Sequence, residues 1–272
     1  MNNILIVGKR GFIGNNLSKY LKKYFIVKHI AFNDLKKYKS KINKFDYVIN
    51  TSINKNYIKK KYNIRFDNDL TISNLIKSEK ITYIFLSSRK VYKSKANITE
   101  NSKLLTKSNY SKNKLITEKK LIKKFKNNIL ILRISNVIGD KSSIKKIHKT
   151  FIDIFFINLK KGFILDNGRN YKDFISINKL CEIIKKIIQK KLVGVFNVSI
   201  GKKIYLNNII KWLNKFNKQK TIKVLKNNNK IDSFYLNNEK LMSKIKVKNS
   251  ISELKKYCYK ISKKKFYLNR KN

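Results

Sequence analysis

The sequence predicts an α/β protein with a doubly wound parallel sheet, and two observations support this fold class. Short apolar runs alternate along the chain with longer segments whose apolar residues recur at helical spacing. No internal repeat or flexible linker interrupts the alternation, so a second lobe would have to grow from loops. With 272 residues, 42% of them hydrophobic, the chain can bury one continuous core.

The expected elements can be placed in order. Strands are predicted at 4–7, 26–32, 47–50, 82–86 and 129–134, where short apolar runs stand between polar segments. Helices are predicted at 12–23, 70–76 and 109–125, where leucines such as Leu17 and Leu21 share one face. The apolar run 151–159 contains Asp153 and is too short to cross a bilayer, so we expect a buried helix there.

The net charge of +51 suggests a polyanion partner, but other features of the composition argue against one. The lysines are spread along the whole chain instead of forming one basic stripe. Proline is absent and alanine is almost absent, as a genome rich in A and T would produce, and such a bias accounts for the lysines too. We therefore expect neither a nucleic-acid nor a membrane partner. The charge should still hasten capture of anionic substrates at low salt.

Cysteines and histidines give no metal site. Cys181 and Cys258 are isolated, and neither His29 nor His148 has ligand spacing, so each histidine is expected on a partly exposed helix or strand. No export signal is visible at the amino terminus, and a reducing cytoplasm is the expected location.

Three of the eight glycines stand together near the amino terminus. Gly8, Gly11 and Gly14 lie between the first expected strand and the first expected helix. Glycines there let the backbone approach a diphosphate, which then rests on the amino terminus of the helix. A plain strand-to-helix turn is the alternative, but a chain so poor in glycine has little reason to use three in one turn. We predict a dinucleotide site that also includes Arg10, Phe12 and Ile13.

Tyr110 and Lys114 open the helix that follows the fourth strand, and Ser88 ends that strand. A lysine four residues after a tyrosine can stabilise its phenolate, which needs about three pKa units, or ~4 kcal/mol, to act at neutral pH. The spacing alone carries little weight, because it recurs at Tyr24/Lys28, Tyr57/Lys61, Tyr259/Lys263 and Tyr267/Lys271. Only the position after the fourth strand selects Tyr110 and Lys114.

These motifs, in this order, resemble the extended short-chain dehydrogenase/reductase family of nucleotide-sugar epimerases, dehydratases and reductases. The resemblance runs to about Leu241 and includes 45–50, 85–92, 110–118, 132–139, 172–175 and 194–198. It implies a Rossmann core of residues 1–138 and 174–199, and a small substrate-binding lobe of residues 139–173 and 200–272. It also suggests a homodimer.

The resemblance assigns roles residue by residue. Ser88 would hydrogen-bond the reacting sugar oxygen, Tyr110 would exchange its proton, and Lys114 would bind the nicotinamide ribose and lower the tyrosine pKa. Asn136 matches a position near the substrate diphosphate, and Arg89 follows Ser88 into the substrate site. The other predicted substrate-binding residues are Lys172 and Arg169. Lys172 replaces the family's arginine and cannot form its two parallel hydrogen bonds to phosphate. Arg169 either takes over that role or is an exposed loop residue.

The adenosine end departs from the pattern of NAD-specific members. Phe32 stands where they place an acid, and Asn33, Asp34 and Leu35 follow, the last two resembling the pair that flanks the adenine. Arg10 stands where NADP-using reductases of the family carry an arginine. The cofactor expected is therefore NADP, with NAD possible and a solvated Arg10 as the alternative.

The expected function is NAD(P)H-dependent reduction of a keto group on a nucleotide-activated sugar, for surface polysaccharide synthesis. Dehydratases of the family place Asp-Glu after the catalytic hydroxyl residue, whereas Arg89 and Lys90 stand here, which disfavours dehydration. A C4 epimerase that recycles its NAD is the alternative within the fold. A silent cofactor-sensing or nucleic-acid-binding relative is the alternative from another class.

Overall fold

The computed structural model describes residues 1–140, 151–165, 170–218, 223–225 and 232–266. At its centre lies a six-stranded parallel sheet, which confirms the predicted fold class, with strand order β10-β5-β4-β3-β1-β2. The strands are β1 (Asn3–Val7), β2 (Ile26–Ile30), β3 (Tyr47–Asn50), β4 (Thr82–Ser88), β5 (Ile129–Ile134) and β10 (Gly194–Val198).

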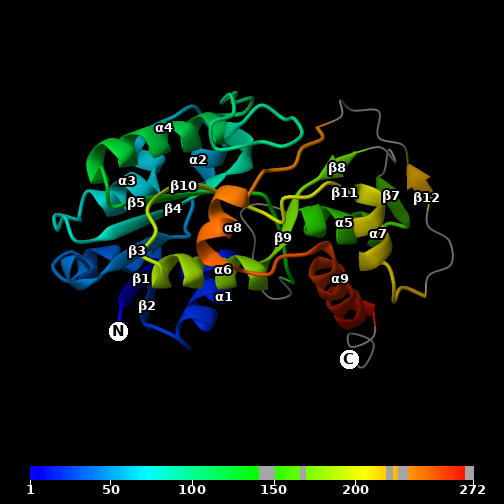
Figure 1. Cartoon of the computed structure of the whole chain (residues 1–272), viewed down its shortest axis with the longest axis horizontal. Coiled ribbons are helices and arrows are strands. Elements are labelled where there is room, and N and C mark those ends of the chain that lie inside the picture. Colours follow the sequence, from blue (N-terminus) through cyan, green and yellow to red (C-terminus); the bar gives the residue numbers. More distant parts are fainter. Residues whose placement is uncertain (141–150, 166–169, 219–222, 226–231, 267–272) are drawn as a thin grey trace.

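Helices cover both faces of the sheet (Figure 1). On one face lie α1 (Phe12–Leu21), α6 (Ile177–Gln189) and α8 (Glu239–Ile245), and on the other α2 (Lys55–Lys59), α3 (Asn68–Ser73) and α4 (Asn109–Phe125). Successive β1 side chains alternate between two hydrophobic clusters: Ile4 and Ile6 pack toward α1 and α6, while Leu5 and Val7 pack toward α3 and α4. Burial on both faces explains why the strands read as continuous apolar runs.

Several observed bounds differ from the predicted ones: α1 ends at Leu21, β4 continues to Ser88, and larger differences occur at β2 and α3. β2 ends at Ile30 because the chain turns into the 3-10 helices η1 (Phe32–Tyr38) and η2 (Ile42–Lys44) before β3. The helix predicted at 70–76 begins earlier because the Asp67 carboxylate accepts the backbone N–H groups of Asp69 and Leu70. Strands 47–50 and 129–134 and helix 109–125 have their predicted bounds.

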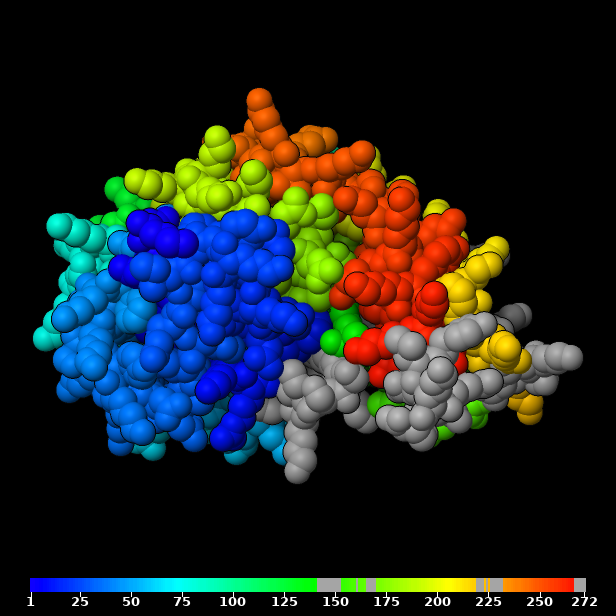
Figure 2. Space-filling model, turned by 90° about the horizontal axis from the view of Figure 1, so that it is seen from below, coloured from blue at the N-terminus to red at the C-terminus, as the bar shows by residue number. Residues whose placement is uncertain are grey.

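A smaller layer lies beside the sheet (Figure 1). It contains α5 (Phe151–Lys160), α7 (Leu206–Leu213), α9 (Ile251–Phe266) and the short strands β7 (Phe163–Leu165), β8 (Tyr171–Lys172), β11 (Ile204–Tyr205) and β12 (Lys223–Leu225). Its cluster includes Phe155, Leu159, Trp212 and Leu254. The pair β6 (Asn136–Ile138) and β9 (Phe174–Ser176) joins the two layers. Figure 2 shows α6 (yellow-green) between the amino-terminal residues (blue) and α9 (red).

Within the described part of the chain, no helix has the length and apolarity needed to cross a membrane. α5 forms over the predicted apolar run, and it buries Phe155 while leaving Ile154 exposed. One face of this helix therefore packs on the smaller layer, and the other faces solvent.

The order in which strands are added reverses at β1, because β2 pairs on one side of it and β3 on the other. At such a point the connecting helices lie on opposite faces of the sheet. A crevice therefore forms at the carboxyl ends of the adjacent strands, here β1 and β3. The glycine loop follows β1 there, and residues 51–54 follow β3. This edge of the sheet is where a ligand site is expected.

Candidate active site

The glycine loop folds tightly against the segment after β3. Gly8 has a φ of +122°, and a Cβ built on Gly8 or Gly14 would collide with the Thr51 side chain. Thr51 is fixed in turn, because its backbone N–H and its Oγ1 donate to the Val7 carbonyl at 2.8 and 2.9 Å. Only glycine can occupy positions 8 and 14 without moving the loop.

The amino terminus of α1 is suited to an anionic group. Gly11 is its N-cap residue, no side chain caps the helix, and no acidic residue lies in the first turn. Helix N–H groups without a side-chain cap, together with the helix dipole, favour a diphosphate at this place. Arg10 is exposed beside it, whereas Phe12 is buried and Ile13 packs against the core. These residues match the requirements of a dinucleotide cofactor.

The residues predicted at the adenosine end lie in η1. Asn33 is exposed and Asp34 is half-buried, so both are open to a ligand beside β2. Leu35 packs into the cluster formed by Val7, Val48 and their neighbours, which leaves its backbone as the part available to a cofactor.

Ser88 and Tyr110 are carried by the end of β4 and the start of α4. Ser88 caps the 3-10 helix η4 (Arg89–Val91), where its Oγ accepts the Lys90 N–H at 3.3 Å. Ser108 and Ser111 form a capping box that fixes the first turn of α4, which carries Tyr110. Among the described residues, the Ser88 hydroxyl proton has no acceptor and the Tyr110 hydroxyl forms no hydrogen bond. Both hydroxyls can therefore bind a substrate oxygen.

Lys114 is buried below this pair. Its Nζ donates to the Leu86 carbonyl of β4 at 2.9 Å and lies 4.4 Å from the centre of the Phe85 ring. Asp69 of α3 is buried and accepts the Tyr83 hydroxyl at 2.9 Å. Burial raises the pKa of Asp69 to about 6, and attraction to Lys114 opposes the rise. The lysine predicted for the catalytic set thus lies close to an acid.

Two predicted substrate residues meet at an acid that sequence reasoning did not select. Arg89 Nη2 lies 2.7 Å and Lys172 Nζ 3.4 Å from Asp232 Oδ2, and Ser94 donates to the other carboxylate oxygen. The Arg89 guanidinium also stacks on Phe234, 3.8 Å from its ring centre. Burial raises the pKa of Asp232, but the hydrogen bonds from Arg89 and Ser94 and the positive charges of Arg89 and Lys172 hold this pKa well below its ordinary value.

The remaining substrate predictions lie partly outside this cluster. Asn136 Nδ2 donates to the Asp173 carbonyl at 3.2 Å, where β6 meets β9. Arg169 and His148 lie outside the described residues. His29 is a partly exposed residue of β2, as expected.

A buried polar network supports the end of β4 from behind. Arg133 of β5 pairs with Glu118 of α4 at 2.7 Å, and Glu118 also accepts the hydroxyl of Ser87, the neighbour of Ser88. Arg133 donates to Tyr92, whose hydroxyl donates to Asn197 of β10 at 2.8 Å. A fully paired network of this kind fixes the relative positions of three strands and α4.

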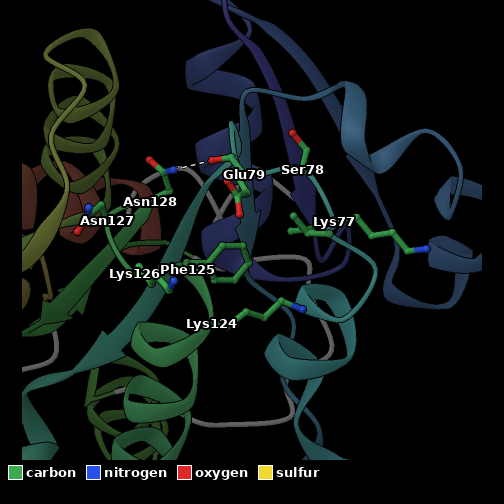
Figure 3. Close-up of a pocket in the computed structure, with 9 residues that line it drawn as sticks. Lys77, Ser78, Glu79, Lys124, Phe125, Lys126, Asn127 and Asn128 are labelled. Carbon is green, nitrogen blue, oxygen red and sulfur yellow. Dashed lines mark hydrogen bonds between the residues drawn. The ribbon is translucent and has the colours of Figure 1, made fainter.

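A surface pocket occurs at the opposite end of the sheet (Figure 3). It is lined by residues 76–79 and 124–128, and Asn128 Nδ2 donates to the Glu79 carbonyl at 2.5 Å across it. β4 and β5 begin beside this pocket at Thr82 and Ile129, so it lies far along the strands from Ser88. It is separate from the candidate site.

The chain is similar to known proteins in its sequence profile and in its fold. The sequence profile of the NAD dependent epimerase/dehydratase family matches residues 4–199. No curated protein matches the chain in sequence.

Several solved structures share the fold. A UDP-N-acetylglucosamine 4-epimerase from Methanobrevibacter ruminantium M1 superimposes with a TM-score of 0.80 at 20% identity, covering 99% of both chains. A dTDP-4-dehydrorhamnose reductase from Clostridium acetobutylicum gives 0.73 at 20% identity, covering 94% of this chain and 98% of its own. RMD from Pseudomonas aeruginosa, solved with NADPH, gives 0.74 at 16% identity, covering 96% and 98%.

Proposed function

The chain belongs to the NAD dependent epimerase/dehydratase family, and we propose that it reduces a keto group on a nucleotide-linked sugar with NADPH. The observation that carries the proposal is the pair of hydroxyls at the end of β4 and the start of α4. Among the described residues the Ser88 hydroxyl proton has no acceptor and the Tyr110 hydroxyl forms no hydrogen bond, and Lys90 adjoins both residues. Two hydroxyls beside a dinucleotide loop suit proton transfer at a sugar oxygen.

The residues would divide the work as follows. The diphosphate of the cofactor would rest on Gly11 and the first turn of α1. Ser88 would donate a hydrogen bond to the carbonyl oxygen of the sugar and orient it. Tyr110 would deliver the proton to that oxygen, and the nicotinamide would supply the hydride when bound. Lys114, anchored on Leu86, would reach the cofactor ribose from below.

A cluster of three cations, Arg89, Lys90 and Lys172, would bind the nucleotide diphosphate of the substrate. Arg89, Lys90 and Lys172 carry three positive charges around the single carboxylate of Asp232. The excess of positive charge is complementary to a diphosphate group, and Arg89 offers a planar fork for phosphate oxygens. Asn136, Arg169 and the smaller layer would complete the sugar site, with the division between core and lobe as predicted above.

NADP is the cofactor that the residues support best. The position expected to carry a ribose-binding acid is Phe32, and Arg10 is exposed next to the glycine loop. A guanidinium there can pair with a 2′-phosphate, whereas NAD offers no such group. NAD is retained as the alternative cofactor. Surface polysaccharide synthesis, a cytoplasmic location and a homodimer are part of the same proposal, and nucleic acid is not a proposed partner.

The second candidate function is C4 epimerisation, which the structural likeness to a UDP-N-acetylglucosamine 4-epimerase favours. An epimerase holds its NAD firmly and returns the same hydride to the sugar. This chain lacks the ribose acid and the usual phosphate arginine, and both changes favour an exchangeable cofactor consumed in each turnover. The reductase is therefore the preferred candidate.

The deciding experiment measures the nicotinamide during turnover. The purified protein is expected to carry little NAD and to oxidise NADPH one-for-one with a nucleotide-linked 4-keto-6-deoxy sugar. Interconversion of two sugar nucleotides without net change in nicotinamide absorbance would instead establish the epimerase. A protein that binds neither NADPH nor NADH would contradict both candidates and favour a silent relative.

A further inference from the structure

Two lysines lie near Tyr110, and their side chains are placed differently. Lys114, one turn further along α4, is buried, and its ammonium donates to the Leu86 carbonyl at 2.9 Å. Lys90 belongs to η4, and its ammonium lies 5.8 Å from the centre of the Tyr110 ring. Of the cations that the structure describes, Lys90 is therefore the one in contact with the Tyr110 ring.

The charge of Lys90 is not neutralised by a partner of its own. No carboxylate in the described ranges forms an ion pair with it. Asp232, whose charge acts on Lys90, is bound by Arg89 and Lys172. Burial lowers the pKa of Lys90, repulsion from Arg89 and Lys172 lowers it further, and attraction to Asp232 opposes both. Lys90 is solvent-exposed, so water moderates the attraction between its ammonium and a negative charge that forms nearby.

The groups that can act on Tyr110 come from three elements. They are Lys90 of η4, Lys114 of α4 itself and Tyr57 of α2, whose phenol interacts electrostatically with Tyr110. Tyr57 is buried, and burial raises its pKa far above the ordinary value, so it stays neutral. The two lysines are thus the charged members of this set near neutral pH.

We infer that Lys90 is a positioning residue of the reaction centre, and that its ammonium stabilises the phenolate form of Tyr110. The backbone N–H of residue 90 donates to the Ser88 hydroxyl oxygen at 3.3 Å, a contact that does not depend on the lysine side chain. The Lys90 side chain would therefore act on Tyr110, from the 3-10 helix that Ser88 caps. The purpose of this arrangement rests on the proposed function, whereas the electrostatic effect on Tyr110 does not.

The distance of 5.8 Å from the Lys90 ammonium to the centre of the Tyr110 ring sets the scale of the expected effect on the Tyr110 pKa. A unit charge about 6 Å away shifts a phenol pKa by roughly 0.5 units in a water-like medium and by roughly 2 units at the dielectric response typical of protein sites. Removing the Lys90 charge should therefore raise the Tyr110 pKa by an amount that titration can resolve.

The test follows Tyr110 by NMR in protein labelled with ¹³C at the tyrosine Cζ, whose chemical shift reports ionisation. The Tyr110 resonance is identified by its loss in Tyr110→Phe. We expect Lys90→Gln to raise the Tyr110 pKa by about 0.5 to 2 units, and Lys90→Arg to restore it. Lys95→Gln, which removes an exposed lysine from the following loop, should leave it unchanged.

An unchanged Tyr110 midpoint in Lys90→Gln would overturn the inference. If the Tyr110 pKa rose in Lys114→Met but not in Lys90→Gln, the effect would belong to Lys114 alone and the inference would be overturned. The other tyrosine resonances show whether each variant is folded, and Lys90→Met serves as a second variant should Lys90→Gln fail that check. The titration uses no substrate, so a failure of the proposed reduction would leave its result intact.

If the reduction is confirmed, the pH profile of kcat gives a second readout. In Lys90→Gln, the part of the kcat profile that reflects Tyr110 ionisation should shift along the pH axis by the same amount as the NMR midpoint. Lys90→Arg should restore its wild-type position. A purely structural role would lower kcat without shifting that part of the profile.

Discussion

Arg89 donates hydrogen bonds to both carboxylate oxygens of Asp232, a residue 143 positions further along the chain. The pair joins the end of β4 to the segment that precedes α8, and Lys172 of β8 contacts the same carboxylate. One acid thus holds two cations that come from the sheet and from the smaller layer. The arrangement of the proposed substrate site depends on it.

Replacing Asp232 should therefore disturb both stability and substrate binding. Breaking a buried pair costs about 3–5 kcal/mol, but the Asp232 side chain is 43% exposed, so we expect Asp232→Ala to lower the free energy of unfolding by about 1–2 kcal/mol. Arg89 and Lys172 would also lose their common anchor, which should weaken binding of the proposed nucleotide-sugar substrate about tenfold. Urea unfolding and calorimetry measure the two effects. Glu79→Gln, which changes an exposed acid far from the site, is the control.

The geometry of the glycine loop predicts different outcomes for substitutions at Gly11 and Gly14. A Cβ on Gly11 would meet only the Gly8 and Thr51 carbonyl oxygens, at 3.3 and 3.4 Å, so Gly11→Ala should fold but bind NADPH at least tenfold more weakly. A Cβ on Gly14 would collide with the Thr51 side chain and the Gly8 backbone, so Gly14→Ala should lower stability itself. NADPH fluorescence titration and urea unfolding separate the two. Wild-type NADPH affinity in folded Gly11→Ala and Gly11→Val would refute the cofactor assignment.

Tyrosine substitutions distinguish the catalytic phenol from a structural one. Tyr110→Phe should reduce turnover by about 10²-fold or more, with cofactor affinity and stability nearly unchanged, because it removes a proton donor. Tyr57 is buried and its hydroxyl contacts Thr117 at 2.7 Å, so Tyr57→Phe should cost about 1 kcal/mol of stability with less effect on kcat. If Tyr57→Phe or Tyr259→Phe were the change that abolished turnover, the choice of Tyr110 would be wrong.

Cofactor preference can be tested at Arg10, which is exposed beside the amino terminus of α1. Arg10→Ala should weaken NADPH by about tenfold and NADH much less, because only NADPH offers a 2′-phosphate to the guanidinium. Lys9→Ala removes an adjacent exposed charge and serves as the control. Equal losses for both cofactors in Arg10→Ala would show that Arg10 does not bind the 2′-phosphate.

The sequence predicted the parts of the fold that depend on local pattern. The parallel strands, α4 and the glycine loop follow from apolar periodicity and from glycine positions, which act over a few residues. The start of α3 was placed too late because it depends on Asp67, whose capping role is hard to distinguish among the neighbouring Asp and Asn residues. β2 was predicted too long because a 3-10 helix, not a further strand, follows Ala31.

The site was predictable only where chain neighbours define it. Ser88, Tyr110 and Lys114 could be selected because Ser88 ends β4 and the other two lie in the first turns of the helix that follows it. Asp232 could not, because it meets Arg89 through a contact over 143 residues and stands in a stretch rich in lysine and asparagine. Thr51 gave no signal either, since its importance comes from the space that Gly8 and Gly14 leave beside it.

The buried acid below Lys114 predicts how stability should vary with pH. Burial raises the pKa of Asp69 to about 6, whereas an unfolded aspartate titrates near its ordinary value of 3.8. Between these values the folded state binds the proton and the unfolded state does not, so stability falls as pH rises through this window. Below about pH 3 the carboxyl is mostly protonated in both states, and above about pH 7 it is ionised in both, so the dependence should vanish at each end.

Asp69→Asn should remove this dependence while keeping the structure, because the Asn Oδ1 can still accept the Tyr83 hydroxyl. Relative to this variant, the wild type should lose up to about 3 kcal/mol of unfolding free energy between pH 4 and pH 7. Urea unfolding at several pH values measures the difference, with Glu239→Gln as a matched change at an exposed acid. Lys114 opposes the rise, so Lys114→Met should steepen the wild-type loss. A wild type that gains stability relative to Asp69→Asn over the same range would mean that attraction to Lys114 outweighs burial, and that Asp69 and Lys114 form an ionised pair beneath the reacting hydroxyls.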